Sequence, residues 1–344
     1  MTTYELTTLL ATPNLVCLPD APAIPGLAFR PFRGGADYPA MISVLKGSKM
    51  ADGIWDGETV ADLANAYAHL GDCDPFQNVL CAQVEGEMIS YNRVHWYTDV
   101  EGNSIYAHFG FLVPEWRRKG IGRAMLHHSE RRLREIAADR PADGMRFLQS
   151  EAADSQPGAE ALLLSERYTA VRHEYEMSRE IAGDIPCAPL PEGLDARPVR
   201  PEHYRAIWDA KEEAFRDHWG YRPETEQDYQ RWLADPKFDS SLWRVAWDGD
   251  QVAGLVGGVI NVEENADCNV KRGWIGPVCV RRPWRRCGVA RALLVQVCQA
   301  LQRYGMTEAA LGVDAQNLTG ALRVYESVGF RVFKRFSLYR KPIE

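Results

Sequence analysis

The chain contains an internal repeat, and this repeat restricts its fold more than any other feature of the sequence. Residues 117–122 read Arg-Arg-Lys-Gly-Ile-Gly, and residues 285–290 read Arg-Arg-Cys-Gly-Val-Ala, 168 positions later (285 − 117 = 168). The motif L-x-x-R-P-x-R occurs at 27–33 and again at 194–200, at nearly the same spacing (194 − 27 = 167). Self-similarity at one period indicates repeated structural units. We therefore predict a tandem of two like domains.

Length and composition agree with two globular domains. A chain of 344 residues has room for two domains of ordinary size, each with its own core. Hydrophobic residues make up 46% and charged residues 25% of the chain, and no apolar run is long enough to cross a bilayer. Residues 1–18 have no basic segment leading into an apolar one, so we do not expect a secretory signal.

The cysteines and the net charge indicate a cytoplasmic protein with a small-molecule partner. The eight cysteines form no C-x-x-C pair and no Cys/His cluster with zinc spacing, so we expect reduced thiols and no metal. The net charge of −7 disfavours nucleic acid, whose phosphate backbone needs a basic face. A cationic or amine-bearing small molecule fits this charge better. A monomer and a homodimer both stay open.

Proline-rich segments mark the predicted domain boundaries. Residues 1–25 form a lead-in, and residues 182–193 form a Pro-rich linker. The first domain is then 26–181 and the second is 194–344.

The second domain has the clearer pattern of helices and strands. Asp248-Gly249 is a hairpin signal between two strands, and Gly329 is in the position of a helix-ending glycine. The predicted elements, in order, are a helix at 202–215, a loop at 216–223, strands at 241–247, 251–261 and 273–280, a helix at 288–304, a strand at 309–313, a helix at 318–327 and a strand at 331–338.

The repeated loop has the residues of a phosphate site. A strand that ends in Arg-x-x-Gly-x-Gly/Ala and runs into a helix leaves several backbone N–H groups at the positive end of the helix dipole. Gly288 and Ala290 let a ligand reach the backbone, while Arg285 and Arg286 can add charge-assisted contacts to a pyrophosphate. The loop alone fits a basic helix-capping turn equally well.

Downstream of the second loop the chain resembles the GNAT superfamily of N-acetyltransferases. The loop at 285–290 matches the family's pyrophosphate loop. The family signature N-x-x-x-A-x-x-x-Y-x-x-x-G-F is matched by Asn317, Ala321, Tyr325, Gly329 and Phe330. The resemblance covers the chain from Leu27 onward as two copies, and the tandem arrangement is similar to that of mycothiol synthase and related two-domain acetyltransferases.

This resemblance implies an α/β fold with two tandem domains, each a mixed sheet flanked by helices. Each sheet is expected to splay between its fourth and fifth strands, with acetyl-coenzyme A in the gap. In the second domain the resemblance implies cofactor contacts from Val278, Cys279, Val280, Arg285, Arg286, Cys287, Gly288, Val289, Ala290, Arg291, Asn317 and Ala321. The matching positions of the first domain are Leu112, Val113, Arg117, Arg118, Lys119, Gly120, Ile121, Gly122 and Arg123.

The implied reaction is acetyl transfer to the primary amine of a small molecule by direct attack in a ternary complex. Tyr325 would protonate the leaving thiolate as general acid, and a phenol of pKa about 10 suits that donor role. Outside the motif, the same residue would be expected to be a half-buried core tyrosine. Cys279 and Cys287 flank the expected thioester site, but neither has a histidine nearby in sequence, so we expect no acetyl-cysteine step.

The general base is not fixed by the motif. Many family members have a glutamate on the fourth strand, whereas residues 274–280 contain no acid. The candidates are Asp217 and His218, in the loop after the first helix, and Glu263, Glu264 and Asp267, after the third strand, with Glu344 as an outside candidate. Each of them is also expected as an ordinary solvated charge, and a base acting through ordered water is an alternative.

The two repeats are not expected to be equal. Aligning Gly329 with Arg167 (329 − 167 = 162) places Leu163 opposite Tyr325 and Ser155 opposite Asn317. The first domain therefore keeps the loop but lacks the acid, and we expect it to be degenerate, with catalysis in the second domain. The alternatives are a non-catalytic coenzyme A sensor or, among enzymes, an acetyltransferase like mycothiol synthase.

Overall fold

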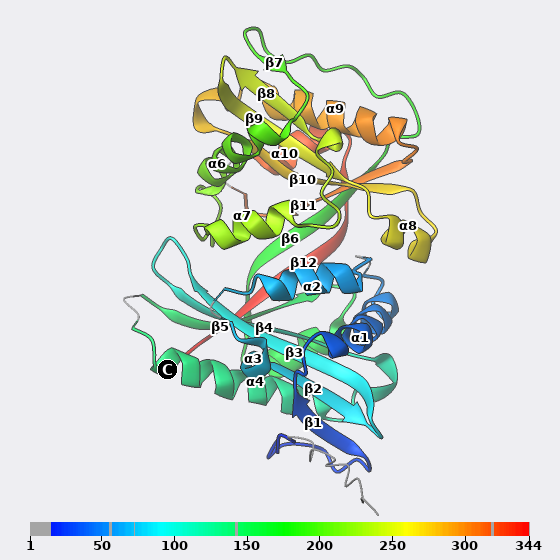
Figure 1. The fold of residues 1–344 in the computed structure, drawn as a ribbon, viewed down its shortest axis with the longest axis vertical. Helices are drawn as coiled ribbons and strands as arrows, with labels where there is room; N and C mark the ends of the chain where they lie inside the picture. The colour runs from blue at the N-terminus through cyan, green and yellow to red at the C-terminus, as the bar shows by residue number, and fades with distance from the viewer. Residues whose placement is uncertain (1–14, 55–56, 72, 142–143, 318–319, 344) are drawn as a thin grey trace, which may run out of the picture.

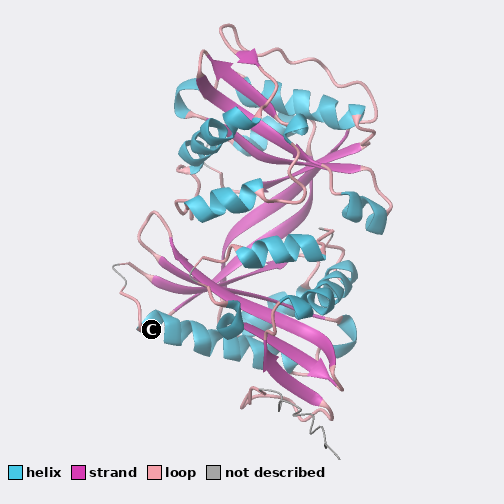
Figure 2. Ribbon diagram, viewed as in Figure 1, coloured by secondary structure: helices cyan, strands magenta, loops and turns pink. Residues whose placement is uncertain are grey.

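One mixed sheet of twelve strands runs through the computed structural model, with helices on both of its faces (Figure 2). Its strand order is β1-β2-β3-β4-β5-β12-β6-β11-β10-β9-β8-β7. The structure describes residues 15–54, 57–71, 73–141, 144–317 and 320–343. The strands are β1 (Leu27–Pro31), β2 (Val79–Val84), β3 (Glu87–Thr98), β4 (Ser104–Leu112), β5 (Arg146–Ala153), β6 (Thr169–Glu180), β7 (Asp195–Ala196), β8 (Arg244–Asp248), β9 (Gln251–Val259), β10 (Arg272–Val280), β11 (Glu308–Asp314) and β12 (Arg331–Pro342).

The helices follow a similar order in both repeats, but α8, between β9 and β10, has no counterpart between β3 and β4, and the place of α3 is taken in the second repeat by a 3-10 turn. The α-helices are α1 (Tyr38–Ala51), α2 (Val60–Ala68), α3 (Pro75–Asn78), α4 (Ile121–Ala138), α5 (Pro157–Ser165), α6 (Tyr204–Phe215), α7 (Glu226–Leu233), α8 (Val262–Cys268), α9 (Val289–Arg303) and α10 (Ala321–Ser327). Short 3-10 turns lie at Gly35–Asp37, Pro114–Trp116, Pro201–His203, Ser240–Leu242 and Arg282–Trp284.

The elements predicted for the second repeat are present with shifted ends. The helix predicted from residue 318 begins at Ala321, and residues 318–319 lie outside the described residues. Gly329 ends this helix with a positive φ of 98°, and Phe330 N–H donates back to the Tyr325 carbonyl at 3.1 Å. Strand β12 continues to Pro342, beyond its predicted end at 338. Helices α7 and α8 were not predicted.

The backbone confirms the alignment of the two repeats after the loop. Arg167 takes the place of Gly329, with φ 66°, and Tyr168 N–H donates to the Leu163 carbonyl at 3.0 Å. The offset falls from 168 at the loops to 162 here because α4 has 18 residues, α9 has 15, and the connection after α4 is also longer.

The repeats exchange their last strands. β12 of the second repeat pairs with β5 of the first, and β6 of the first repeat pairs with β11 of the second. β6 and β12 pair with each other in antiparallel fashion at the centre, where they run between the two lobes of Figure 1. We call β1–β5 with β12 the N-terminal half, and β7–β11 with β6 the C-terminal half. The linker at 182–193 therefore separates the repeats along the chain but does not separate the halves of the sheet.

Each half has its core on both faces of the sheet. In the N-terminal half, α1 and α2 cover one face around Met41 and Tyr91, and α4 covers the other around Leu133 and Leu148. In the C-terminal half, α6 and α9 pack against the sheet in one large cluster. Apolar burial of this kind stabilises the layers.

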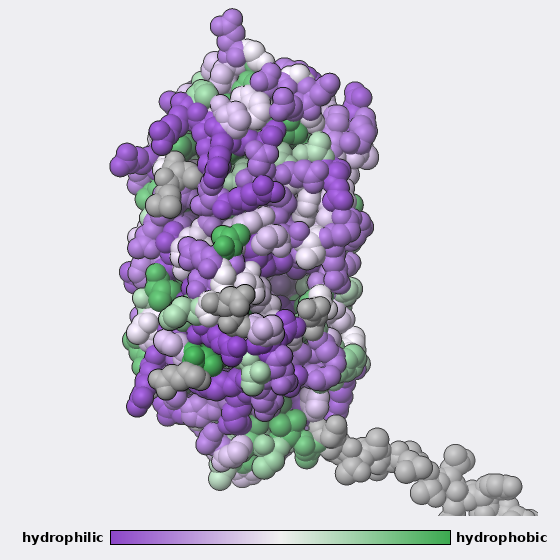
Figure 3. All heavy atoms as spheres, turned by 90° about the vertical axis from the view of Figure 1, so that its left-hand side faces the viewer, coloured by the Kyte–Doolittle hydropathy of each residue, from purple (hydrophilic) through white to green (hydrophobic). Residues whose placement is uncertain are grey.

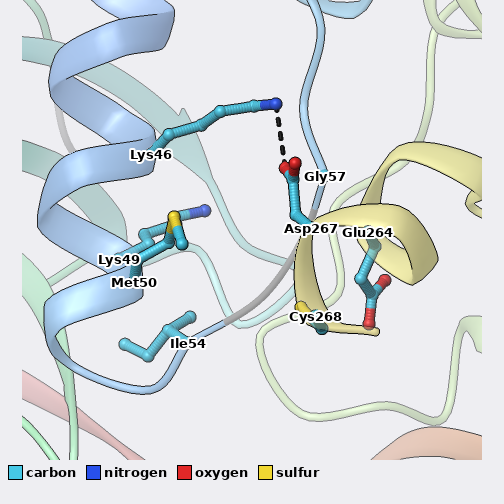
Figure 4. Close-up of a pocket in the computed structure, with 8 residues that line it drawn as sticks. All are labelled: Lys46, Lys49, Met50, Ile54, Gly57, Glu264, Asp267 and Cys268. Atoms are coloured by element: carbon cyan, nitrogen blue, oxygen red, sulfur yellow. Dashed lines mark hydrogen bonds and ion pairs between the residues drawn. The ribbon is translucent and has the colours of Figure 1, made fainter. Parts of the chain in front are cut away.

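Helix α8 joins the second repeat to α1 of the first. Lys46 Nζ donates to Asp267 at 2.9 Å, and Figure 4 shows this ion pair bridging the two helices. The backbone of Gly57 approaches α8 so closely that a Cβ there would lie 2.3 Å from the Glu264 nitrogen. Glycine is therefore required at position 57 by close packing.

The remaining general features agree with the sequence. All eight cysteines are free thiols. Among the helices described, none combines the length and apolar character that a bilayer crossing requires. Figure 3 shows one side of the molecule with hydrophilic side chains over most of it.

Candidate active site

The sheet opens at the same place in both repeats. β4 and β5 pair in parallel only from Ser104 to Ala107, although β4 continues to Leu112. β10 and β11 pair only from Arg272 to Ile275, although β10 continues to Val280. The predicted splay between the fourth and fifth strands is therefore present twice.

Both loops have a geometry that fits a pyrophosphate. Arg118 and Gly120 have φ of 64° and 89°, and Arg286 and Gly288 have φ of 63° and 93°. In the part of the chain that is described, the backbone N–H groups of residues 118–123 and 286–291 donate to no protein acceptor. Such N–H groups at the start of a long helix form an anion site, so coenzyme A fits both loops.

The first arginine of the second loop braces the loop. Arg285 Nε donates to the Val280 carbonyl at 2.9 Å, and Nη2 donates to the Ala214 carbonyl at 3.1 Å. Its guanidinium also forms an ion pair with Asp217. All of these partners are protein groups, so Arg285 fixes the loop to β10 and α6 instead of reaching for the ligand as the sequence suggested.

The first loop has the same brace. Arg117 donates to the Leu112 carbonyl at 3.2 Å, to the Ser48 carbonyl at 3.0 Å and to both oxygens of Asp52. The sequence did not reveal this arrangement, because Asp52 and Asp217 lie outside the repeated motif.

The other cationic side chains of the two loops differ in whether a protein group already holds them. Arg118, Arg286 and Arg291 have no ion-pair partner among the residues described, so they remain available to a phosphate. Lys119 Nζ lies 4.4 Å from the centre of the Trp116 ring, and Arg123 donates to Glu166 at 2.9 Å. The ion pair thus holds the Arg123 side chain at the end of α5, so Arg123 is not free to contact a phosphate as the sequence suggested.

Tyr325 lies in the core beneath the opening of the C-terminal half. Its side chain is 5% exposed, on α10, and burial raises the pKa of the phenol, with Cys279 of β10 as a second cause. Burial also raises the pKa of the Cys279 thiol to about 12, so this sulfur stays protonated at neutral pH. Asn317 lies in the turn before α10 and accepts from Ala321 N–H at 3.5 Å.

Three of the candidate bases, Asp217, His218 and Glu263, lie in different environments, and Glu344 lies outside the described residues. The hydrogen bonds of Arg282 and Arg285 hold the pKa of Asp217 well below its usual value, so Asp217 is engaged as a structural anion. Glu263 is exposed on the first turn of α8, the helix that packs toward α1. His218 packs on Phe215 with ring centres 4.4 Å apart, and burial lowers the pKa of its imidazole. A neutral His218 is the best proton acceptor of the three.

A large cavity occupies the opening in the N-terminal half. Its volume is about 1140 Å³, and its walls include the loop residues Arg118, Gly120 and Gly122. Leu163, the residue opposite Tyr325, also lines it. His108 is buried in the wall, where it shares a 3.0 Å hydrogen bond with the Tyr168 hydroxyl, and burial lowers the pKa of this histidine to about 4.

Sequence reasoning missed four charged residues that line this cavity: Lys49, Asp52, Glu151 and Glu176. Glu151 lies on β5 and Glu176 on β6, strands with neighbours on both sides. A charged residue within a central strand was the available signal, because such positions are normally apolar.

Comparison with known proteins identifies the family of this fold. The model described as "Acetyltransferase (GNAT) family" matches residues 48–150 and 204–330, one region in each repeat. The mycothiol acetyltransferase of Geodermatophilus obscurus is 28% identical over 298 residues, which is 86% of this chain and 91% of the relative. The mycothiol acetyltransferase of Streptomyces scabiei is 29% identical over 317 residues, 90% of this chain and 94% of the relative.

Solved structures agree. A GCN5-related N-acetyltransferase from Sphaerobacter thermophilus superimposes with a TM-score of 0.68 and 28% identity, over 95% of this chain and 97% of that one. A tandem GNAT protein from the clavulanic acid biosynthesis pathway has a TM-score of 0.65 over 92% of this chain and 98% of that one, and at 15% identity it supports the fold alone.

Proposed function

The chain belongs to the GNAT family of acetyltransferases, and from this premise we propose that it moves an acetyl group from acetyl-coenzyme A to a primary amine of a small molecule. The family and its curated relatives identify an acyltransferase that uses an acyl-coenzyme A. This sets aside the alternative of a non-catalytic sensor for the chain as a whole.

The observation that carries the proposal is the position of Tyr325 in the C-terminal half. Its phenol is buried close to Cys279, on the part of β10 that has separated from β11. The phosphate loop of this half, residues 285–290, follows β10 and leads into α9. A thioester whose phosphates lie on the loop would reach the phenol along the open edge of β10. No tyrosine stands at this place in the first repeat, where Leu163 replaces it.

The proposed reaction needs three proton transfers. His218, neutral at pH 7, accepts a proton from the acceptor's ammonium group, directly or through water. The free amine attacks the thioester carbonyl, the C–S bond breaks, and Tyr325 protonates the sulfur as it leaves. The acylated nitrogen then loses its second proton, which returns to the Tyr325 phenolate, so that a neutral amide and a neutral phenol result. The raised pKa of Tyr325 keeps it protonated and ready to donate.

We extend the proposal to the organisation of the chain and to its acceptor. Residues 26–181 form one repeat and 194–344 the other, joined by 182–193 and exchanging their last strands, with the catalytic residues in the second. Relatives named mycothiol acetyltransferase make an amine on a thiol precursor the first acceptor to test.

The test is Tyr325→Phe in the full chain. Thiol release from acetyl-coenzyme A, with an acceptor found by screening amines, should fall by about a hundredfold or more, the usual contribution of a general acid. The dissociation constant of coenzyme A should stay within about twofold, because the phenylalanine keeps the ring. Full turnover in this variant would remove Tyr325 from the mechanism.

A further inference from the structure

Arg172 of β6 lies at the open end of the C-terminal half, although the first repeat contributes it. β10 pairs with β11 only as far as Leu311, so in the described pairing residues 312–314 have β6 as their one neighbouring strand. Ala315 N–H continues this contact by donating to the His173 carbonyl at 2.9 Å. The exchanged strand therefore holds the end of β11 where the opening of the sheet has removed its other neighbour.

The guanidinium of Arg172 fixes the turn that leads to Asn317. Its Nε and Nη2 donate to the two carboxylate oxygens of Asp314 at 2.9 Å and 2.6 Å, and the two side chains are only 15% and 16% exposed. Nη2 also donates to the Gln316 carbonyl at 3.3 Å, while Gln316 N–H donates to Asp314 at 3.0 Å. A two-pronged ion pair of this kind fixes direction as well as distance. Arg172 thus sets the turn before α10, the helix that carries Tyr325.

The same guanidinium contacts the loop that carries His218. It lies 4.8 Å from the centre of the Trp219 ring, and the guanidinium of Arg340 on β12 lies 4.5 Å from that centre. A cation over an indole ring is attracted to the ring face, and the attraction is stronger where water is excluded. The loop of His218 is therefore held by both exchanged strands.

The first repeat lacks this arrangement. β6 and β12 match residue by residue, so Lys334 stands where Arg172 stands (331 − 169 = 162, and 172 + 162 = 334). Ala152 occupies the place of Asp314 (314 − 162 = 152), so that position has no carboxylate. Lys334 donates to the Gly53 carbonyl instead. In the part of the chain that is described, the two-way link is thus made at the C-terminal opening alone.

We propose that Arg172 is a positioning residue for the second repeat's site, holding the loop of His218 and the turn before Asn317 in one fixed arrangement. This inference rests on the function proposed above, because it concerns the placing of the proton acceptor and of the helix that carries the proton donor. Arg172 acts through Trp219 and Asp314, not by touching the substrate. The strand exchange then gives the first repeat a part in catalysis at the second.

Arg172→Met in the full chain removes both links and keeps an unbranched apolar stem. Turnover in the thiol-release assay should fall by about tenfold or more, because small misplacements of reacting groups are costly. KM for acetyl-coenzyme A should change by less than about threefold, because Asp217 and Arg285 still brace the phosphate loop. Arg172→Lys keeps the charge without the two-pronged geometry and should recover part of the lost turnover. Lys334→Met, at the matching place in the first repeat, is the control and should leave kcat within about twofold, because distant sites act independently.

The pH profile separates positioning from a loss of folded enzyme. Burial is the main cause that lowers the pKa of His218, and the charges that act on it are those of Asp314, Arg285 and Asp217. Asp314 raises that pKa, and in Arg172→Met its carboxylate has lost the cation that balances it. The acid limb of kcat/KM should therefore move to higher pH. Arg172→Lys keeps a cation there and should keep the wild-type limb.

A second measurement needs no turnover. Arg216 is exposed at the start of the loop, so trypsin cleavage after it reports how firmly the loop is held. Cleavage should be about threefold faster or more in Arg172→Met and in Trp219→Leu than in the wild type. Thermal unfolding of each variant checks that it folds as the wild type does.

Unchanged trypsin cleavage, or wild-type kcat in Arg172→Met, would overturn the proposal. So would a lowered kcat with an unmoved acid limb, provided that His218→Gln loses that limb. Tyr325→Phe keeps the two hypotheses apart. If Tyr325→Phe loses turnover and Arg172→Met keeps it, the positioning role alone fails. If Tyr325→Phe keeps full turnover, the C-terminal chemistry fails, and faster cleavage in Arg172→Met would still support its hold on the loop.

Discussion

Arg117 donates to both carboxylate oxygens of Asp52, at 2.6 Å and 3.0 Å, and so ties the start of the first phosphate loop to the end of α1. Arg285 and Asp217 make the same connection in the second repeat, between the second loop and the residues after α6. In each repeat the arginine also donates to two backbone carbonyls. The conformation of the loop is therefore held by a helix that is distant from it in sequence.

Replacing Asp217 by Asn should loosen the second loop. Arg285 keeps its two carbonyl partners but loses the ion pair, so the N–H groups of the loop become less well ordered. We expect KM for acetyl-coenzyme A to rise by roughly five- to tenfold, since the pair is partly exposed, with a smaller change in kcat. Steady-state kinetics measures both. Asp52→Asn is the matched control and should leave turnover at the second site unchanged. An equal effect of both substitutions on KM would contradict the assignment of catalysis to the second repeat.

The pH profile should report His218. Burial lowers the pKa of its imidazole below the ordinary value of about 6.5, so the neutral form that accepts a proton is present above that value and is lost as the pH falls through the lowered pKa. The acid limb of kcat/KM should therefore lie below pH 6.5. His218→Gln should abolish this limb and reduce kcat by about a hundredfold. A limb that persists in His218→Gln would assign the base to another group.

His108 should make the fold sensitive to acid. Its pKa is about 4 in the folded protein and about 6.5 when unfolded, so the stability it contributes is complete above pH 6.5 and is lost as the pH falls toward 4. Between pH 7.5 and 5.0 this amounts to about 2 kcal/mol in the free energy of unfolding. Urea unfolding at both pH values should show this drop in the free energy of unfolding in the wild type. In His108→Gln the drop between pH 7.5 and 5.0 should be smaller by about 2 kcal/mol. His95, with a similar pKa, contributes equally to both proteins.

The exchange of strands predicts that the repeats do not separate. A protease site inserted in the linker at 182–193 should give two fragments that stay together, because β12 pairs with β5 and β6 pairs with β11. Size-exclusion chromatography of the cut protein should show one particle of the uncut size. Deleting 331–344 should instead leave β5 with an open edge and cause aggregation. Fragments that separate after cutting, each folded, would contradict this topology.

Much of the fold could be predicted because it depends on local patterns. The tight turn at Gly249, the left-handed residue at 329 and the loop glycines have their conformations fixed by residues adjacent in sequence. Helices α7 and α8 were missed because they are short and polar, and packing against other elements stabilises them.

The sequence by itself determined that there are two repeats, that each has a phosphate loop, and that only the second has a tyrosine in the place of the acid. These follow from residue identity and spacing, which the chain carries wherever it folds. Only the tertiary structure decided that the repeats share one sheet, that Asp217 is bound to Arg285, and that Glu151 faces a cavity. Strand partners, ion pairs and cavities are relations between distant segments, so their energies depend on contacts that no local pattern specifies.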